Sequence, residues 1–310
     1  MTTQSLLSLF TLATLQATDL ASHSQQKIPA GNVPAAAPER RYAAGALYSV
    51  GQTMTSVSVY RLGRPPLVEF PVQLPGASAV RVQAIATAAD GRFAVSAGGA
   101  DPSGRLSSAI IFYTPEGAVS KIVKTWPFTA ARLAFTVNGV LWAAGVTKDL
   151  TSPRLDEAPG QSVLRQYSPE GTLVGSSLAR ESLSTDPLQH PLHGGMMAHS
   201  NHFVAILTAS HKLVVVDEAG RTVSERKLEL PEGHRFRTVA VTDSGRVFAH
   251  SVRSSVASLF EVDTRSGTLR PVSTGTALPD YQAVNLVGSE GESLVFFSPR
   301  DFVLTWAALR

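Results

Sequence analysis

Residues 82–124, VQAIATAADGRFAVSAGGADPSGRLSSAIIFYTPEGAVSKIVK, decide the fold of this chain. They hold four short runs rich in Val, Ile, Phe and Tyr, separated by turn residues such as Asp90-Gly91 and Pro115-Glu116-Gly117. Short β-branched and aromatic runs divided by such turns predict a four-stranded antiparallel meander. One sheet of this kind cannot bury both of its faces alone, so further copies must pack against it.

Imperfect copies of this unit recur along the chain, and two turns per copy align them. The first turn falls at Gly45, Gly91, Gly139, Ser200-Asn201, Gly245 and Gly291, and the second at Gly63, Gly117, Gly171, Gly220 and Gly267. The residues around the second turn recur as YTPEG, YSPEG, VDEAG and VDTRSG. A period of about 45–50 residues with four strands per unit is the signature of a β-propeller. A β-sandwich would not repeat two glycine turns in register.

The number of turns predicts how the ring closes. The last copy has a first turn at Gly291 and a third strand, FVLTWAAL, but no second turn follows it. We therefore expect an all-β, six-bladed propeller of four-stranded antiparallel blades, whose last blade is completed by an N-terminal strand within Lys27 to Arg40. Proline residues in that segment are compatible with an outer, edge strand. Closure protects the sheet edges from association, and we expect a monomer.

On these turns and strand patterns, residues 42–310 resemble the six-bladed β-propellers of the NHL-repeat and TolB-like kind. The resemblance concerns the fold, because it depends on turn spacing and not on functional residues. The Gly-His and Trp-Asp pairs of WD40 repeats are missing, and the paired glycines of kelch repeats do not recur. The resemblance therefore implies an architecture and leaves the activity open.

The N-terminal segment has two interpretations. Residues 6–15 form an apolar run of signal-peptide length, and Ala17 or Ala21 could precede a cleavage site, so residues 1–22 are a candidate signal peptide. No Lys or Arg precedes the run, which leaves a frayed helix as the other interpretation. The run is too short to span a membrane. A signal peptide would place the protein in the periplasm or outside the cell, with the cytoplasm as the equal alternative. Residues 23–41 are then a linker or closing strap.

Composition narrows the classes of function. Charged residues make up 16% of the chain, which is low against the roughly 25% of typical domains, and the formal net charge of +3 is small. Without a block of Lys and Arg, we expect no nucleic-acid partner. Cysteine is absent, which excludes disulfides, thiolate metal sites and cysteine nucleophiles. We expect neither a cofactor nor a transmembrane segment.

Topology predicts which face of the propeller carries function. Both glycine turns of a blade fall on one face, which we name the turn face, and the long irregular loops fall on the opposite one, the loop face. Binding residues concentrate on variable loops held by a rigid scaffold. The candidates on the loop face are Trp126, His190, His193, His234, Arg235 and Tyr281. The aromatic candidates could anchor a partner or pack as wedges between blades.

The stretch HPLHGGMMAHSNH, residues 190–202, brings four histidines close together in sequence beside two methionines. Imidazole and thioether groups are copper ligands, and imidazole alone serves zinc or iron. By the alignment, His193 and His202 lie at opposite ends of one inner strand, about 20 Å apart at roughly 3.3 Å per residue. We therefore expect loop and channel-lining histidines, and we keep His190 and His193 as the two candidate metal ligands.

The inner strands argue against catalysis. Their polar residues are Gln83, Arg132, His199, Thr238 and Asn285. Without a carboxylate in mid-strand, a calcium site at the channel mouth would lack its charge, and no G-x-S-x-G elbow is present. We expect a non-catalytic binding or protein-interaction module whose loop face holds a protein, peptide or glycan. A propeller hydrolase or lactonase with a metal at the channel mouth is the alternative, and a purely structural sensor domain is a third.

Overall fold

The structure is a computed structural model. It describes residues 18–28, 39–63, 67–136, 138–151, 158, 160–183, 196–199, 203–208, 210–254, 256–275, 278 and 284–310. In that part of the chain the regular structure consists of strands β1 to β24 and one short helix, α1 (Arg180–Leu183). The protein is therefore all-β, as predicted. No helix among these residues has the length and apolar character that a membrane crossing needs.

Residues 82–124, together with the three residues before them, form the predicted meander. Its strands are β6 (Ala79–Thr87), β7 (Phe93–Ala100), β8 (Leu106–Tyr113) and β9 (Val119–Lys124). They pair antiparallel in sequence order. The first three strands carry most of the buried side chains, whereas β9 is largely exposed, because an outer strand has little packed against it.

Three further sheets repeat this order. One holds β2 (Arg40–Ala43), β3 (Ala46–Val50), β4 (Ser56–Arg61) and β5 (Leu67–Pro71). Another holds β10 (Phe128–Phe135), β11 (Leu141–Thr147), β12 (Ser162–Tyr167) and β13 (Leu173–Ala179). The third holds β14 (Met196–His199), β15 (Phe203–Leu207), β16 (Lys212–Asp217) and β17 (Thr222–Lys227).

The remaining strands form one eight-stranded sheet in the order β18-β19-β20-β21-β1-β24-β23-β22. Its first half holds β18 (Arg235–Val241), β19 (Val247–Arg253), β20 (Val256–Val262) and β21 (Leu269–Ser273). Its second half holds β22 (Asn285–Glu290), β23 (Ser293–Ser298), β24 (Val303–Leu309) and the N-terminal strand β1 (Thr18–Lys27). The two halves meet through a short parallel pairing of β1 with β21.

The closing strand lies earlier in the chain than predicted. We expected it within Lys27 to Arg40, but β1 ends at Lys27 and pairs antiparallel with β24 from Leu20 to Lys27. The sequence TDLASHSQQK hides this strand because it is an outer strand with an exposed face. Leu20 is a buried apolar side chain within the strand, and Ile28, directly after it, is another. The strand also covers part of the candidate signal peptide, so Ala17 is the cleavage position that would leave β1 whole.

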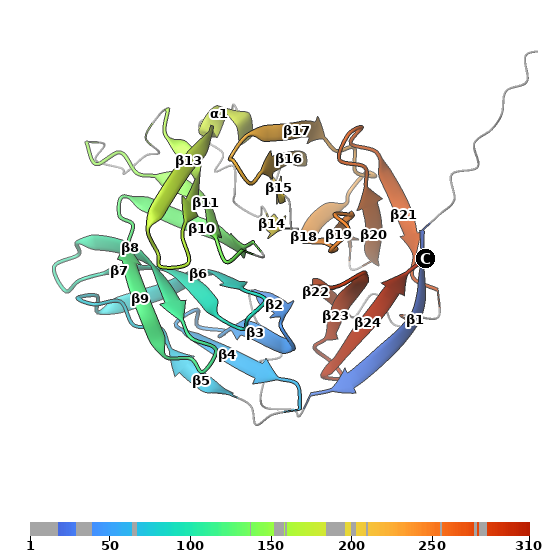
Figure 1. Cartoon of the computed structure of the whole chain (residues 1–310), viewed down its shortest axis with the longest axis horizontal. Coiled ribbons are helices and arrows are strands. Elements are labelled where there is room, and N and C mark those ends of the chain that lie inside the picture. The colour runs from blue at the N-terminus through green and yellow to red at the C-terminus, as the bar shows by residue number, and fades with distance from the viewer. Residues whose placement is uncertain are drawn as a thin grey trace, which may run out of the picture.

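The sheets are arranged around a central axis, and the strands nearest the middle are β2, β6, β10, β14, β18 and β22 (Figure 1). These inner strands contact one another in the order β2, β6, β10, β14, β18, β22 and back to β2. The hydrophobic core lies between neighbouring sheets. Where β1 and β24 come together, the core joins Ile28 after β1, Tyr42 of β2, Leu47 of β3, and Val295 and Phe297 of β23.

The glycine turns are confirmed by the backbone. Every predicted turn glycine has a positive φ, from 56° at Gly291 to 88° at Gly117. Such values fall in the left-handed region, which glycine adopts without steric cost. The recurring glycines thus allow the left-handed backbone conformation of each turn. Because every copy of the unit needs that conformation, the glycines mark equivalent positions in the copies. The Ser200-Asn201 turn lies outside the described residues.

Candidate functional site

Two hollows open at opposite ends of the inner strands. Strand β6 shows this directly, because Arg81 and Gln83 near its start line one hollow and Ile85 and Thr87 near its end line the other. The first hollow lies at the loop-face end, between the sheets β6–β9 and β10–β13, and we name it the loop groove. The second lies at the turn-face end of the central channel, and we name it the channel-mouth cavity.

The loop groove has a volume of about 430 Å³ and combines an aromatic ring with cationic side chains. Trp126, in the segment between β9 and β10, is half-buried in its wall. Arg81 at the start of β6 is exposed, and Lys148 directly after β11 is half-buried. None of the described residues that line the groove is acidic. The groove therefore has a positive charge beside an apolar, planar surface.

Backbone hydrogen bonds fix the position of Trp126. Thr125 donates its backbone N–H to the carbonyl of Ser108 at 2.9 Å, and Lys148 donates to the carbonyl of Pro127 at 3.1 Å. The first bond ties this segment to β8, and the second ties it to the end of β11. The tryptophan and Lys148 thus come from segments that are held together, which makes the groove a preformed feature.

The floor of the groove is built around Gln83 and a pair of glycines on β7. A Cβ on Gly98 would lie 2.9 Å from Nε2 of Gln83, so the amide lies directly over the glycine on β7 and would have to shift to make room for a side chain. Gln83 Oε1 is buried and has no hydrogen-bond partner. A buried acceptor without a partner is costly. Gln83 therefore forms a polar part of the groove floor beside the two cations, with its Oε1 enclosed by protein atoms.

The structure locates three of the predicted site residues, and it does not bring them together. Trp126 lines the loop groove, whereas His234 and Arg235 lie at the start of β18, in a different sheet. Arg235 is exposed, but His234 is half-buried and its Nδ1 lies 3.0 Å from Oγ of Ser251. Its ring also packs edge-on against Phe260. These contacts favour a structural role for His234.

The other predicted site residues, His190, His193 and Tyr281, lie outside the described residues. For the part of the chain that is described, no group of three or more His, Cys, Asp or Glu side chains could hold a metal ion. The channel-mouth metal of the hydrolase alternative therefore finds no ligand set among those residues.

The inner strands carry a charged pair that their sequence pattern did not reveal, because β2 has only four residues and begins inside the predicted strap. Arg41 on β2 forms a 3.0 Å ion pair with Glu39, and both side chains are less than one-fifth exposed. On β10, burial lowers the pKa of the Arg132 guanidinium. Nearby Glu39 opposes this shift in pKa, and Arg41 adds to it. Arginines from two inner strands thus share the electrostatic field of one carboxylate.

A second buried group lies near β18. His250 on β19 is 1% exposed, and burial, reinforced by the charge of Arg237, lowers the pKa of His250 to about 4. The imidazole is therefore neutral at physiological pH.

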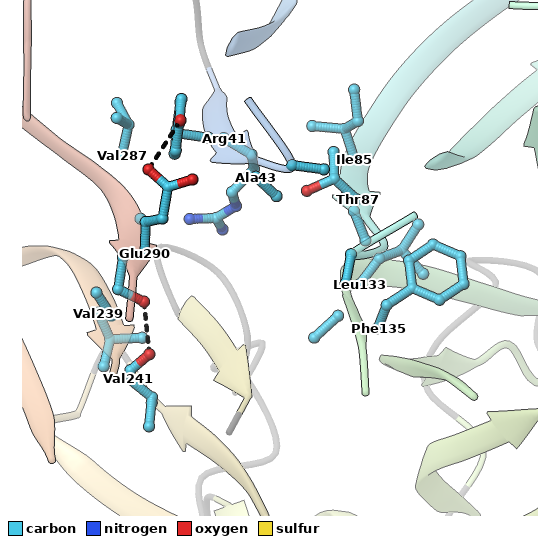
Figure 2. A pocket seen from close by; sticks show the side chains of 18 of the residues that line it. Arg41, Ala43, Ile85, Thr87, Leu133, Phe135, Val239, Val241, Val287 and Glu290 are labelled. Carbon is cyan, nitrogen blue, oxygen red and sulfur yellow. Dashed lines mark hydrogen bonds between the residues drawn. The ribbon is translucent and has the colours of Figure 1, made fainter. Parts of the chain in front are cut away.

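The channel-mouth cavity has a volume of about 360 Å³ and is lined by five inner strands and their turns. Its walls are mainly apolar, with Ile85, Leu133, Phe135, Val239, Val241 and Val287 among them. The charged lining residues are Arg41, Asp243 and Glu290. Figure 2 shows the Arg41 guanidinium and the Glu290 carboxylate pointing into the same space from neighbouring strands.

Comparisons with known proteins support the fold and give no family. No family model matches the chain, and no curated protein matches it. Similar solved structures include a protein from Bacteroides fragilis named as a candidate exported protein, 10% identical with a TM-score of 0.56 over 93% of this chain and 95% of that one. A protein of unknown function from Bacteroides caccae is 11% identical, with a TM-score of 0.54 over 82% of both chains.

A third similar structure is a luciferin-regenerating enzyme, 14% identical with a TM-score of 0.52 over 93% of this chain and 95% of that one. At such low identity these likenesses concern the fold alone. Together with the four-stranded antiparallel sheets around one axis, they define the class of protein as β-propeller-like. The NHL-repeat resemblance finds no matching family model.

Proposed function

We propose that this protein is a non-catalytic binding module whose loop groove holds an acidic peptide segment of a partner protein. The observation that carries the proposal is the groove itself, in which Trp126, Arg81 and Lys148 converge without an acidic residue among the described lining. Tryptophan and arginine are the residues that most often dominate binding energy at interfaces. The amide of Gln83 adds a polar group to the floor of the groove.

Charge complementarity supports a peptide that carries carboxylates. A carboxylate would pair with Arg81 or Lys148, and an apolar side chain would lie on the indole of Trp126. Pairs at the rim of an interface mainly set association rate and salt dependence, whereas a half-buried aromatic anchor mainly sets the dissociation rate. We therefore expect binding that weakens with salt through slower association.

The test is fluorescence polarisation with a labelled decapeptide of Asp, Glu and one Phe, beside a peptide with Asn and Gln in place of the acids. We expect the acidic peptide alone to bind, and Trp126→Ala to weaken it by about 30-fold, as for an interface hot spot. Arg81→Glu should weaken it at low salt. Arg235→Glu is the matched control, since it reverses an exposed arginine on the same face but outside the groove.

Two results would overturn this proposal. Equal binding of both peptides would show that charge does not select the ligand. Binding of an oligogalacturonate but neither peptide would identify the groove as a glycan site. A second function, the metal-dependent hydrolase, has no supporting observation among the described residues.

We further propose that the eight-stranded sheet counts as two blades joined by β1, which makes six in all, with residues 18–310 as one propeller domain. The support is that each half repeats the strand order of the four-stranded sheets. We also propose export with cleavage after Ala17, because a chain that starts at Thr18 keeps β1 whole. Mass spectrometry of the protein from cell fractions tests this, and a full-length cytoplasmic product would contradict it.

A further inference from the structure

The channel-mouth cavity holds opposite charges on separate strands above an apolar wall. It lies at the other end of the inner strands from the loop groove, so what it binds is independent of the function proposed above. Its volume of about 360 Å³ is near the lower end of the range for small-molecule sites, roughly 300–1,000 Å³. The cavity is therefore large enough for a small molecule.

The cationic group of the cavity is oriented by its own partner. Arg41 is held by its 3.0 Å ion pair with Glu39, through one of its terminal nitrogens, Nη2. A guanidinium carries five N–H donors in a fixed fork, so one bound carboxylate leaves donors that a second can use. Both side chains are mostly buried, which strengthens electrostatic interactions there.

The carboxylate of Glu290, the anionic group, is also held in place by hydrogen bonds. Oε2 of Glu290 accepts a hydrogen bond from the Tyr42 hydroxyl at 3.1 Å and another from the Trp306 indole N–H at 2.7 Å. The two aromatic rings meet edge to face, with centroids 5.4 Å apart, which fixes both donors. Asp243 adds a second carboxylate to the lining, and its backbone N–H bonds the carbonyl of Gly291, next to Glu290.

We infer that the cavity binds a zwitterionic small molecule with an apolar body, that is, an apolar α-amino acid. Its carboxylate pairs with Arg41, its ammonium group pairs with Glu290, and its side chain lies against the aliphatic wall around Val239 and Val287. A ligand of one charge would gain only one of the two charge-assisted pairs, either with Arg41 or with Glu290. The Arg41 side chain is mostly buried, whereas Glu290 is exposed, so the pair with Arg41 is the stronger of the two and the pair with Glu290 adds to it. The cavity therefore favours a ligand that carries both charges.

The test uses isothermal titration with three probes of similar shape. L-leucine carries both charges, 4-methylpentanoic acid lacks the amine, and 3-methylbutylamine lacks the carboxylate. We expect leucine to bind about tenfold or more tightly than either analogue, as expected for one charged hydrogen-bonded pair. No uptake of leucine, or equal uptake of leucine and one analogue, would overturn the inference.

Two variants assign the charges. In Glu290→Gln the amide oxygen can still accept from Tyr42 and Trp306, but leucine should bind no better than 4-methylpentanoic acid. In Arg41→Gln, leucine should bind no better than 3-methylbutylamine. Should the loss of Arg41 prevent folding, the Glu290→Gln comparison alone decides. Glu292→Gln is the matched control, because this neighbouring carboxylate bonds Ser244 and does not line the cavity. A loss of leucine binding in the control equal to that in Glu290→Gln would also contradict the assignment.

Discussion

Removing the first residues of β1 tests how the ring of sheets is closed. We compare a chain that starts at Thr18 with one that starts at Ser22. The first keeps β1 whole, and the second lacks Thr18 and Leu20. Both side chains are mostly buried, at 8% and 7% exposed. The comparison also separates the two signal-peptide cleavage positions, Ala17 and Ala21, by their effect on the fold.

The magnitude follows from what each side chain contacts. Leu20 packs in the core between the two halves of the eight-stranded sheet, and burying a leucine contributes about 1.5–3 kcal/mol. The Thr18 hydroxyl donates to Glu261 at 2.5 Å. Because Glu261 keeps its 2.8 Å ion pair with Arg246, losing this bond costs only about 1 kcal/mol. We therefore expect the shorter chain to be less stable by roughly 3 kcal/mol.

The assay is equilibrium unfolding in urea, with the midpoint and the slope fitted for both chains. A lower midpoint at unchanged slope reports lost stability rather than a changed unfolded state. Leu20→Ala and Asp19→Ala in the longer chain form the matched pair, since Leu20 is buried and Asp19 is exposed. Equal stability of the two chains, within about 0.5 kcal/mol, would show that Thr18 and Leu20 are not packed as described.

Three more predictions concern stability. Ile28→Ala should cost about 2–5 kcal/mol in urea unfolding, because Ile28 is 0% exposed; a cost below about 0.5 kcal/mol would show that it is not in the core. Gly145→Ala should lower the melting temperature clearly, since its Cβ would lie 2.0 Å from the carbonyl oxygen of Thr129, and an unchanged melting temperature would disprove that close approach. Because the pKa of His250 falls from its usual 6.5 to about 4 on folding, the unfolded chain takes up this proton first as the pH drops. About 3 kcal/mol of stability should thus be present above pH 6.5 and lost between pH 6.5 and 4, and His250→Gln should flatten this slope; the same slope in the variant would assign the loss to other groups.

The sequence predicts the repeated sheets well because their signals are local. Turn glycines with positive φ and alternating apolar runs report on a few neighbouring residues, so the meander over β6 to β9 was predicted from residues 82–124. Strand β1 was placed too late because its pairing with β24 joins the two ends of the chain. An outer strand with polar, exposed residues leaves no periodic pattern to find.

The candidate site was predicted only in part, for the same reason. Trp126 was singled out as an aromatic residue in a loop, and it lines the groove. Arg81, Gln83 and Lys148 were not linked to it, because strand β6 and the end of β11, which are distant from Trp126 in the sequence, bring them there. The Gly98-Gly99 pair was the one local signal, since adjacent glycines inside a strand indicate a close approach by another group. The sequence does not say which residue approaches these glycines; in the structure it is Gln83 of β6 that lies over Gly98.

The measurement that tests the central claim most directly is a crystal structure of the full chain with the acidic decapeptide bound. We predict peptide density in the loop groove, with an apolar side chain on the Trp126 indole and a carboxylate at Arg81 or Lys148. Peptide density elsewhere on the molecule, with this groove unchanged, would contradict the account.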